Sequence, residues 1–318
     1  MANLVSGTTL KNRYTITDQL GKGGMGEVYL ALDESLDTKV AVKANHNLSS
    51  HTAAQFIREA RLLASLKHPN LPRVIDYFTD DDSQYLVMDY VPGDDLKQII
   101  EGNREVSLPQ VMKWATQLGN ALTYLHTQNP PIFHRDIKPA NIKLTPSGDV
   151  VLVDFGIAKT GDASTETQTG AWAFSPGFAP PEQVSGMRTG PYSDQYSLAA
   201  TLYYLLTGKP PADSARRLMG EEEYVPLIKT LPNVPAHFSE AMDRALMIKP
   251  EARFANVADF IEALINPVHA VSGDTSQKTV VASSRMQSPP VMPTPPAVVT
   301  LPPAKKKNGI WLIVGIVA

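Results

Sequence analysis

Apolar and polar positions alternate over much of the first 90 residues of this 318-residue chain. Short runs rich in Val, Ile, Tyr and Phe, separated by turn residues, predict β-strands. Phe56, Ala60 and Leu63 instead recur at steps of three and four, which predicts a helix over residues 52–66. The predicted strands cover residues 14–20, 27–32, 39–43, 74–78 and 84–90. This part of the sequence therefore predicts a small β-rich lobe containing one helix.

Beyond Pro92 the apolar positions follow a helical period. Ser107 is a favourable N-cap and Pro109 is tolerated in a first turn, so a helix is predicted from there to about His126. A β-hairpin is predicted between residues 141 and 153. Later helices, with Ser193, Ser239 and Asn256 as predicted caps, cover residues 193–207, 239–248 and 256–265. The pattern is typical of an α+β fold with a small β-rich lobe, a larger helical lobe and a ligand cleft between them.

The composition changes near residue 267. Residues 267–308 are rich in Ser, Thr and Pro and have no apolar period, which predicts a flexible linker. Residues 309–318 are apolar and follow three lysines at 305–307. Ten helical residues reach about 15 Å, half of a ~30 Å hydrocarbon core, so we expect the start of a truncated membrane helix with the lysines in the cytoplasm. A sticky tail or a short buried helix is the alternative. The predicted folded domain covers residues 12–266. Its β-rich lobe covers residues 12–90 and its helical lobe residues 92–266.

The bulk composition narrows the class of protein. A hydrophobic content of 43% is ordinary for a globular protein with a sizeable core. The formal net charge of −3 argues against a general nucleic-acid binder, which would be strongly basic. The chain contains no cysteine, which excludes disulfides, thiolate zinc sites and a cysteine nucleophile.

A glycine-rich segment lies between the first two predicted strands. Glycines let the backbone approach phosphates closely and offer its N–H groups to them. A strand follows the segment rather than a helix, which disfavours a dinucleotide-binding fold and leaves a plain glycine-rich hairpin as the alternative. The residues of this segment are Gly21, Lys22, Gly23, Gly24, Met25 and Gly26.

The third predicted strand carries one lysine, Lys43, in an apolar run. Glu59 lies on the predicted helix that packs against this lobe. An ion pair between Lys43 and Glu59 would hold the ammonium toward the α- and β-phosphates of a nucleotide. A solvated surface lysine and glutamate are the alternative for either residue taken alone.

A further motif combines an acid, a lysine and an amide as Asp136, Lys138 and Asn141. A second acid, Asp154, begins the sequence Asp-Phe-Gly behind the predicted hairpin. Phosphoryl transfer needs a group that aligns a hydroxyl, a cation for the moving phosphate and oxygen ligands for Mg²⁺. Both fragments, in this order and with an upstream glycine-rich loop, indicate phosphoryl transfer.

Taken in order, these motifs resemble those of eukaryotic-like Ser/Thr protein kinases of the bacterial transmembrane type, over residues 14–264. The resemblance implies the bilobal protein-kinase fold and transfer of the γ-phosphate of ATP to protein Ser/Thr hydroxyls. It implies Mg²⁺ as the cofactor, with Mn²⁺ as an alternative ion. Asp136 would orient and deprotonate the substrate hydroxyl, and Lys138 would contact the γ-phosphate. Asn141 and Asp154 would bind Mg²⁺.

The resemblance also implies where the nucleotide lies. Val28 and Ala41 would cover the adenine from above, and Asp95 stands where such kinases often place an acid that contacts the ribose. Lys143 departs from the pattern, because an apolar residue usually packs below the adenine, although the methylenes of a lysine can do the same. Backbone groups of the connection between the lobes would line the adenine edge, namely those of Asp89, Tyr90 and Val91.

Three residues resemble structural elements of protein kinases. Glu182 follows two prolines in a sequence similar to the family's Ala-Pro-Glu element, and Arg253 resembles its ion-pair partner. Asp194 matches the acid that braces the backbone of the catalytic loop, and it is also a suitable helix N-cap. The matches of Glu182 and Arg253 favour a protein kinase over a small-molecule kinase.

The segment between Gly156 and Pro180 contains the expected regulatory sites. Arg135 precedes the predicted catalytic acid, which in the resembling family often signals activation by a phosphate on this segment. Ser175 stands where the family has a threonine whose hydroxyl bonds the catalytic acid and lysine. The predicted phosphorylation sites are Thr165, Thr167 and Thr169.

The expected partners are protein substrates, a second copy of the chain for phosphorylation in trans, and a membrane through the carboxyl-terminal segment. The expected localisation is the cell membrane, with a single span and the kinase lobes in the cytoplasm. A pseudokinase that binds nucleotide and signals by conformation is the main alternative, although every catalytic polar residue is present. A small-molecule kinase is the second alternative.

Overall fold

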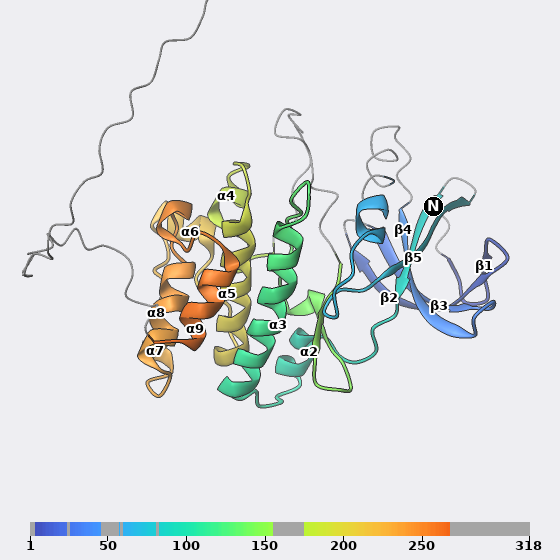
Figure 1. Ribbon diagram of the computed structural model, residues 1–318. Coiled ribbons are helices and arrows are strands. Elements are labelled where there is room, and N and C mark those ends of the chain that lie inside the picture. The colour runs from blue at the N-terminus through green and yellow to red at the C-terminus, as the bar shows by residue number, and fades with distance from the viewer. Residues whose placement is uncertain are drawn as a thin grey trace, which may run out of the picture. The chain divides into compact units, whose positions relative to one another are not determined.

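The computed structural model describes residues 4–23, 26–45, 57, 60–80, 83–154 and 175–267. The amino-terminal part of this range forms one antiparallel sheet of six strands in the order β1-β2-β3-β4-β6-β5 (Figure 1). Its strands are β1 Thr9–Leu10, β2 Tyr14–Gly23, β3 Gly26–Asp33, β4 Thr38–Asn45, β5 Val74–Asp80 and β6 Ser83–Asp89. The five predicted strands are therefore confirmed, whereas β1, which lies before the predicted domain start at residue 12, was not predicted.

The sheet has its own small core. Residues of β3 alternate between buried and half-buried positions, as expected of a strand with one face on a core. The ring of Phe78 stacks between those of Tyr14 and Tyr85, with centroids 5.7 and 5.2 Å away. Val40 and Val42 on the central strand β4 are buried beside these aromatic residues. The alternation of apolar and polar residues in the sequence thus specifies which face of the sheet packs on this core.

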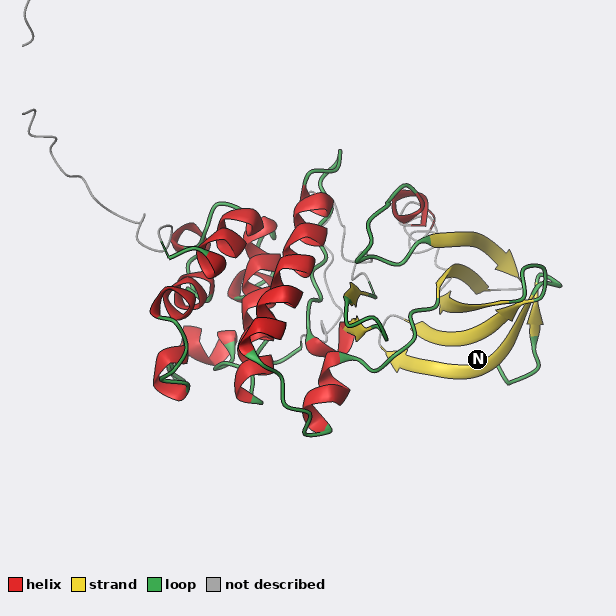
Figure 2. Cartoon of the chain, turned by 60° about the horizontal axis from the view of Figure 1, so that its bottom comes forward, coloured by secondary structure: helices red, strands yellow, loops and turns green. Residues whose placement is uncertain are grey.

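The remaining described residues are mainly helical (Figure 2). The helix α5 is buried along almost its whole length, and α3, α8 and α9 contact it through apolar residues. The helices are α2 Leu96–Glu101, α3 Leu108–His126, α4 Pro181–Val184, α5 Pro191–Thr207, α6 Ser214–Met219, α7 Leu227–Thr230, α8 Ala236–Ala245 and α9 Val257–Ile265. The hairpin β7 Ile142–Leu144 and β8 Val150–Leu152 follows the 3-10 turn at Pro139–Asn141.

Several predicted caps are corrected. Ser107 and Asn256 cap α3 and α9 as predicted, with side chains that accept hydrogen bonds from backbone N–H groups. Ser193 and Ser239 are not the N-cap residues of their helices, because α5 and α8 begin earlier, after Gly190 and Pro235. The short helices α2, α4, α6 and α7 were not predicted, since four to six residues are too few to show a helical period.

Asp194 is not a helix N-cap either. It lies inside the first turn of α5 and is not its N-cap, and its side chain is used elsewhere. Only part of the predicted helix 52–66 can be compared, and residues 60–64 are helical.

Polar contacts join this helical segment and the following loop to the helical lobe. The amide of Lys67 donates to the Tyr124 hydroxyl at 2.9 Å. The side chain of Asn70 donates to the carbonyl of Val150 at 2.7 Å, and the amide of Leu152 donates back to the Asn70 carbonyl at 2.9 Å. These bonds fix the end of the helix against the hairpin that precedes Asp154, so they bring the β-rich lobe to the predicted site.

No helix within the described ranges is long and apolar enough to cross a membrane. The predicted linker and membrane segment, at 267–308 and 309–318, lie outside the described residues except for residue 267.

Candidate active site

A buried carboxylate holds the backbone of the loop that carries Asp136. Both oxygens of Asp194 accept backbone N–H bonds, from His134 at 2.9 Å and from Arg135 at 2.8 Å. His126 adds a contact of 2.8 Å from its Nε2. Arg135 has a φ of +64°, an unfavourable conformation for a residue with a Cβ, so the loop needs this support. The bracing role that the resemblance implied for Asp194 matches this geometry.

Ionisation of Asp194 is set by these contacts. Burial alone raises the pKa of this carboxyl, but the hydrogen bond and charge of His126, with the backbone N–H groups, bring the pKa below its usual value. The ionised Asp194 carboxylate stabilises the fold at pH values above the pKa of an unfolded aspartate, near 3.9. This contribution is lost as the pH falls through the lower pKa of Asp194 in the folded protein.

We therefore expect Asp194→Asn to lower the thermal midpoint at pH 7, and the difference from the wild type to shrink below about pH 4. Thermal denaturation followed by circular dichroism between pH 7 and pH 3 measures this difference. A difference that stays constant over the whole range would contradict the prediction.

Three polar groups meet at Asp136. Its Oδ2 accepts from Lys138 Nζ at 3.0 Å and from Asn141 Nδ2 at 2.9 Å. Asn141 Nδ2 also lies 2.8 Å from the Asp136 carbonyl, which fixes the amide against the loop. The hydroxyl of Ser175 lies 3.1 Å from Lys138 Nζ and 3.5 Å from Asp136 Oδ1. The structure thus brings together four residues from both sides of the undescribed segment 155–174.

A second contact joins the β-rich lobe to the loop after β8. Lys43 is buried on β4, opposite Val28 on β3, and its Nζ lies 2.7 Å from Asp154 Oδ1. Burial alone raises the pKa of Asp154, but the charge and hydrogen bond of Lys43 bring it below the usual value. The ionised Asp154 carboxylate can bind a cation, and the Lys43 ammonium beside it can bind a phosphate.

The side chains fit the Mg²⁺ ion that the resemblance implies. Mg²⁺ prefers oxygen ligands and is usually held by one or two protein groups with substrate phosphates. Asp154 offers a partly exposed carboxylate. Asn141 uses its Nδ2 on Asp136, so Oδ1 is the amide atom that can face an ion. Among the described residues, no group of three acidic or histidine side chains forms a separate metal site.

The described glycines of the glycine-rich segment lie at the ends of two paired strands, because β2 ends at Gly23 and β3 begins at Gly26. Gly26 has a φ of +124°, and a Cβ there would overlap the Ala44 carbonyl, so only glycine fits. Lys22 pairs with Glu27 across the hairpin at 2.7 Å. The register pairs Gly21 with Val28 and Gly23 with Gly26. The hairpin can therefore bring backbone N–H groups close to a ligand.

The predicted adenine site is built around the connection between the lobes. Ala41 is buried on β4 and pairs with Met88 on β6. The carboxylate of Asp89 binds Arg73 at 2.9 Å, and the Asp89 amide donates to the Arg73 carbonyl at 2.9 Å. Val91 is half-buried beyond β6.

Lys143 and Asp95 lie next to each other. They form an isolated antiparallel β-bridge, and Lys143 Nζ donates to the Gly93 carbonyl at 3.3 Å. Asp95 caps α2 by accepting from the amide of Gln98 at 2.9 Å. The predicted ribose contact would therefore use the second carboxylate oxygen of Asp95. Gly93, with a φ of +110°, permits the close approach of Leu144.

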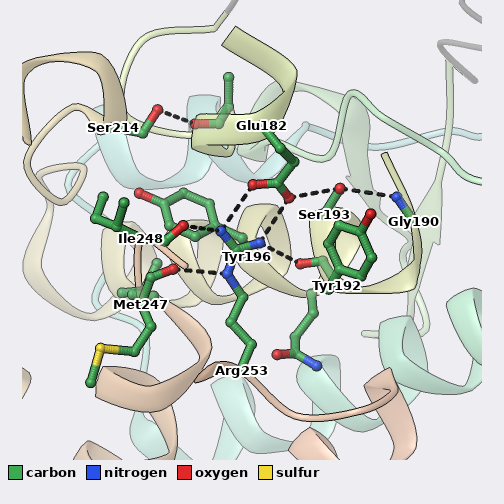
Figure 3. A network of polar contacts seen from close by, with 12 residues as sticks. Glu182, Gly190, Tyr192, Ser193, Tyr196, Ser214, Met247, Ile248 and Arg253 are labelled. Atoms are coloured by element: carbon green, nitrogen blue, oxygen red, sulfur yellow. Dashed lines mark hydrogen bonds and ion pairs between the residues drawn. The ribbon is translucent and has the colours of Figure 1, made fainter. Parts of the chain in front are cut away.

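Glu182 and Arg253 form a buried ion pair at the start of α4 (Figure 3). Arg253 Nη1 and Nη2 bind the two Glu182 oxygens at 2.8 and 3.0 Å. The guanidinium also donates to three backbone carbonyls and lies over the ring of Tyr196. Ser193 donates to Glu182 at 2.7 Å and accepts from the amide of Gly190. The contact expected from the resemblance is present.

Some predicted site residues lie outside the described residues, so their placement stays a prediction. They are Gly24, Met25, Glu59, Thr165, Thr167 and Thr169.

Other residues at the site were not predicted. Gln183 donates from Nε2 to the Arg135 carbonyl at 2.9 Å, and Asp213 accepts from the amide of Gly177 at 2.9 Å. A glutamine and an aspartate in segments without a helical or strand period give no signal in the sequence. Only the fold brings them to the loop.

A glycine-edged hairpin, a lysine on the central strand and a braced acid–lysine–amide loop define a nucleotide-dependent phosphotransferase site. Comparison with known proteins gives the family: a protein kinase domain model matches residues 14–268. The chain belongs to the protein kinase family, and its relatives are bacterial serine/threonine-protein kinases.

Two relatives and one solved structure illustrate the similarity. A probable serine/threonine-protein kinase of Clostridium acetobutylicum is 33% identical over 283 residues, which cover 86% of this chain and 43% of the relative. The serine/threonine-protein kinase PknA of Mycobacterium tuberculosis is 34% identical over 268 residues, covering 81% of this chain and 62% of PknA. The crystal structure of the Mycobacterium tuberculosis PknI kinase domain matches with a TM-score of 0.64 and 30% identity, over 83% of this chain and 99% of that domain. The chain spans about half the length of the two relatives. The kinase fold expected from the sequence is confirmed.

Proposed function

We propose that the chain is an ATP- and Mg²⁺-dependent serine/threonine protein kinase. The observation that carries the proposal is the cluster around Asp136, where Lys138 Nζ, Asn141 Nδ2 and the Ser175 hydroxyl converge. The Lys43–Asp154 contact adds a cation and an anion from the other lobe. The family match and the serine/threonine-protein kinase relatives support the same activity.

In the proposed reaction, Asp136 accepts a hydrogen bond from a serine or threonine hydroxyl of the substrate protein and takes up its proton. The hydroxyl oxygen forms a bond to the γ-phosphorus, and the bond from that phosphorus to the β-phosphate oxygen breaks, which releases ADP. Lys138 faces the transferred phosphoryl group and offsets its charge. Lys43 orients the α- and β-phosphates. Catalysis is thus mainly positioning and charge stabilisation.

Asn141 and Asp154 would hold Mg²⁺, and the bound ion would neutralise charge on the nucleotide phosphates. The Asn141 amide is kept in place by Asp136, and Asp154 by Lys43, so both oxygen ligands are oriented before binding. Val28, Ala41 and the backbone from Asp89 to Val91 would enclose the adenine.

Two other functions remain as alternatives to test. A nucleotide-binding scaffold without transfer activity is suggested only by Lys143 at the predicted adenine site and by the altered substrate-loop sequence, where Phe174 and Ser175 replace the family's Gly-Thr. The Asp136 cluster disfavours it, because a scaffold has no need of an oriented lysine and amide. A small-molecule kinase is disfavoured by the Glu182–Arg253 pair, which braces the segment where a protein substrate would bind.

Transfer of labelled phosphate from Mg-ATP to the chain itself and to generic protein substrates tests the proposal, with Lys43→Met as the control. Phosphoserine or phosphothreonine that appears only with the wild type would support it. Transfer only to small hydroxyl compounds would favour a small-molecule kinase. A wild type that binds ATP without any transfer would favour the scaffold.

We further propose that phosphorylation at Thr165, Thr167 or Thr169, in trans between two copies, activates the site. Burial lowers the pKa of the Arg135 guanidinium, and a phosphate beside it would offset that desolvation cost. Mass spectrometry should find phosphate on this segment, and the triple alanine variant should lose activity. Full activity of the triple variant would refute this regulation.

We also propose that residues 267–308 form a linker and that residues 309–318 begin a membrane helix, with the kinase lobes in the cytoplasm. The three lysines at 305–307 beside an uncharged apolar run support the proposal. Protease added outside intact cells should leave the kinase domain uncut, whereas protease added to opened cells should cut it. The opposite pattern would contradict this orientation.

A further inference from the structure

The segment 175–179, which carries Ser175, is fixed by the connection between α5 and α6. The Gly177 amide donates to Asp213 Oδ2 at 2.9 Å. The hydroxyl of Ser214, a fully buried residue, donates to the Ala179 carbonyl at 2.7 Å. Two consecutive residues that begin α6 therefore hold the backbone of this segment at two points.

Packing in the same region leaves the segment little freedom. Gly177 has a φ of +79°, and a Cβ there would lie 2.7 Å from Cβ of Pro210 and 3.3 Å from the Pro211 carbonyl. The ring of Phe178 meets the edge of the Tyr204 ring at a centroid distance of 5.8 Å. The backbone at Gly177 thus rests directly on the residues that lead into Asp213.

Hydrogen bonds connect the backbone around Gly177 to the catalytic cluster. The amides of Phe178 and Ala179 donate to the Ser175 carbonyl at 3.0 and 3.1 Å, so residues 175–179 form one compact turn. The Ser175 hydroxyl in turn contacts Lys138 Nζ at 3.1 Å. A shift at Gly177 would therefore move Ser175 relative to Lys138.

Asp213 uses its two carboxylate oxygens for different purposes. Oδ1 accepts from the amides of Ala215 and Arg216 at 3.0 and 3.4 Å and so caps α6. Oδ2 accepts from Gly177. An asparagine can keep the cap, but its NH₂ group would then face the Gly177 amide, donor against donor.

We propose that Asp213 is a positioning residue for the phosphorylation of protein substrates: it holds the Gly177 turn so that Ser175 and Lys138 stay aligned with an incoming hydroxyl. The inference rests on the proposed kinase function. The Asp213 carboxylate accepts from Gly177, Ala215 and Arg216, and so it acts on the catalytic cluster through the segment 175–179. Ser214 supports the same segment from its other end.

The test compares the wild type with Asp213→Asn, in steady-state phosphorylation of a generic protein substrate. We expect kcat/KM for the protein to fall about 10- to 100-fold, the range for losing a charge-assisted hydrogen bond. The KM for ATP and the thermal midpoint should stay at the wild-type values, since the helix cap is kept. Asp213→Ser, which retains one capping oxygen, should show the same pattern. Asp259→Asn, in the first turn of α9, is the matched control and should behave as the wild type.

An unchanged kcat/KM in Asp213→Asn would overturn the inference while leaving the kinase function intact. If Asp213→Asn also lowered the thermal midpoint and weakened ATP binding, the inference would be overturned as well, because Asp213 would then be only a structural cap. A wild type that phosphorylates no protein would overturn the inference and the proposed function together.

Discussion

Replacing Asp136 by asparagine should lower phosphate transfer to protein by about 10²- to 10⁴-fold, the usual contribution of a general base. The carboxylate accepts from Lys138 and Asn141 on Oδ2 and lies near the Ser175 hydroxyl. An asparagine cannot take up a proton from the substrate hydroxyl, and its NH₂ group would face donors. The adenine and phosphate contacts do not involve this side chain, so ATP binding should remain.

Phosphate incorporation into a protein substrate and fluorescence titration with an ATP analogue measure the two effects separately. Asp37→Asn is the control, because Asp37 is exposed in the turn between β3 and β4 and has a φ of +50°, which asparagine adopts readily. If Asp136→Asn kept wild-type transfer, the assignment of Asp136 as the base would be wrong. If it lost ATP binding as well, the loop rather than the base would have been disrupted.

Replacing Arg253 by methionine should destabilise the domain by about 3–5 kcal/mol, the typical cost of removing one partner from a buried ion pair. The Arg253 and Glu182 side chains are 0% and 2% exposed, so Glu182 would keep a buried charge with Ser193 as its remaining hydrogen-bond donor among the described residues. The guanidinium also holds three backbone carbonyls, which would lose their donor. The thermal midpoint should fall by roughly 6–20 °C for a domain of this size.

Arg216→Met is the matched control, since Arg216 forms an ion pair with Glu222 but its side chain is 60% exposed. Exposed pairs contribute about 0–1 kcal/mol, so its midpoint should change little. The double variant Glu182→Leu with Arg253→Met should recover part of the loss, because no unpaired charge remains. Equal midpoints for Arg253→Met and Arg216→Met would contradict the energetic role of the buried pair.

The strands and the long helix α3 could be predicted because their patterns are local. The alternation in β3 and the Ser107 cap each lie within one element, so a single stretch of sequence contains all the information. The predicted start of α5 was wrong by two residues, because local sequence does not show which residue is the cap. Ser193 resembles an N-cap in sequence, but it is the third residue of α5, and its hydroxyl accepts from the amide of the N-cap Gly190 and donates to Glu182.

The functional motifs were recognisable because fixed spacing along the chain carries their chemistry. Asp136, Lys138 and Asn141 lie on one short loop, and their mutual contacts follow from its conformation. Their long-range partners were less predictable from residues alone. The Lys43–Asp154 contact joins positions 111 residues apart, and the expected link to Glu59 concerns a residue outside the described ranges.

The sequence by itself determined the strand and helix types, the α+β class and the residues suited to phosphoryl transfer, because periodicity and motif spacing are properties of the chain. The resemblance implied that Asp194 braces the catalytic loop, but only the tertiary structure showed that its partners are the amides of residues 134 and 135. Tertiary structure alone decided that Asp213, also an aspartate at the start of a helix, reaches Gly177. Their partners lie 36 to 60 residues away and are selected only when the core around α5 has packed.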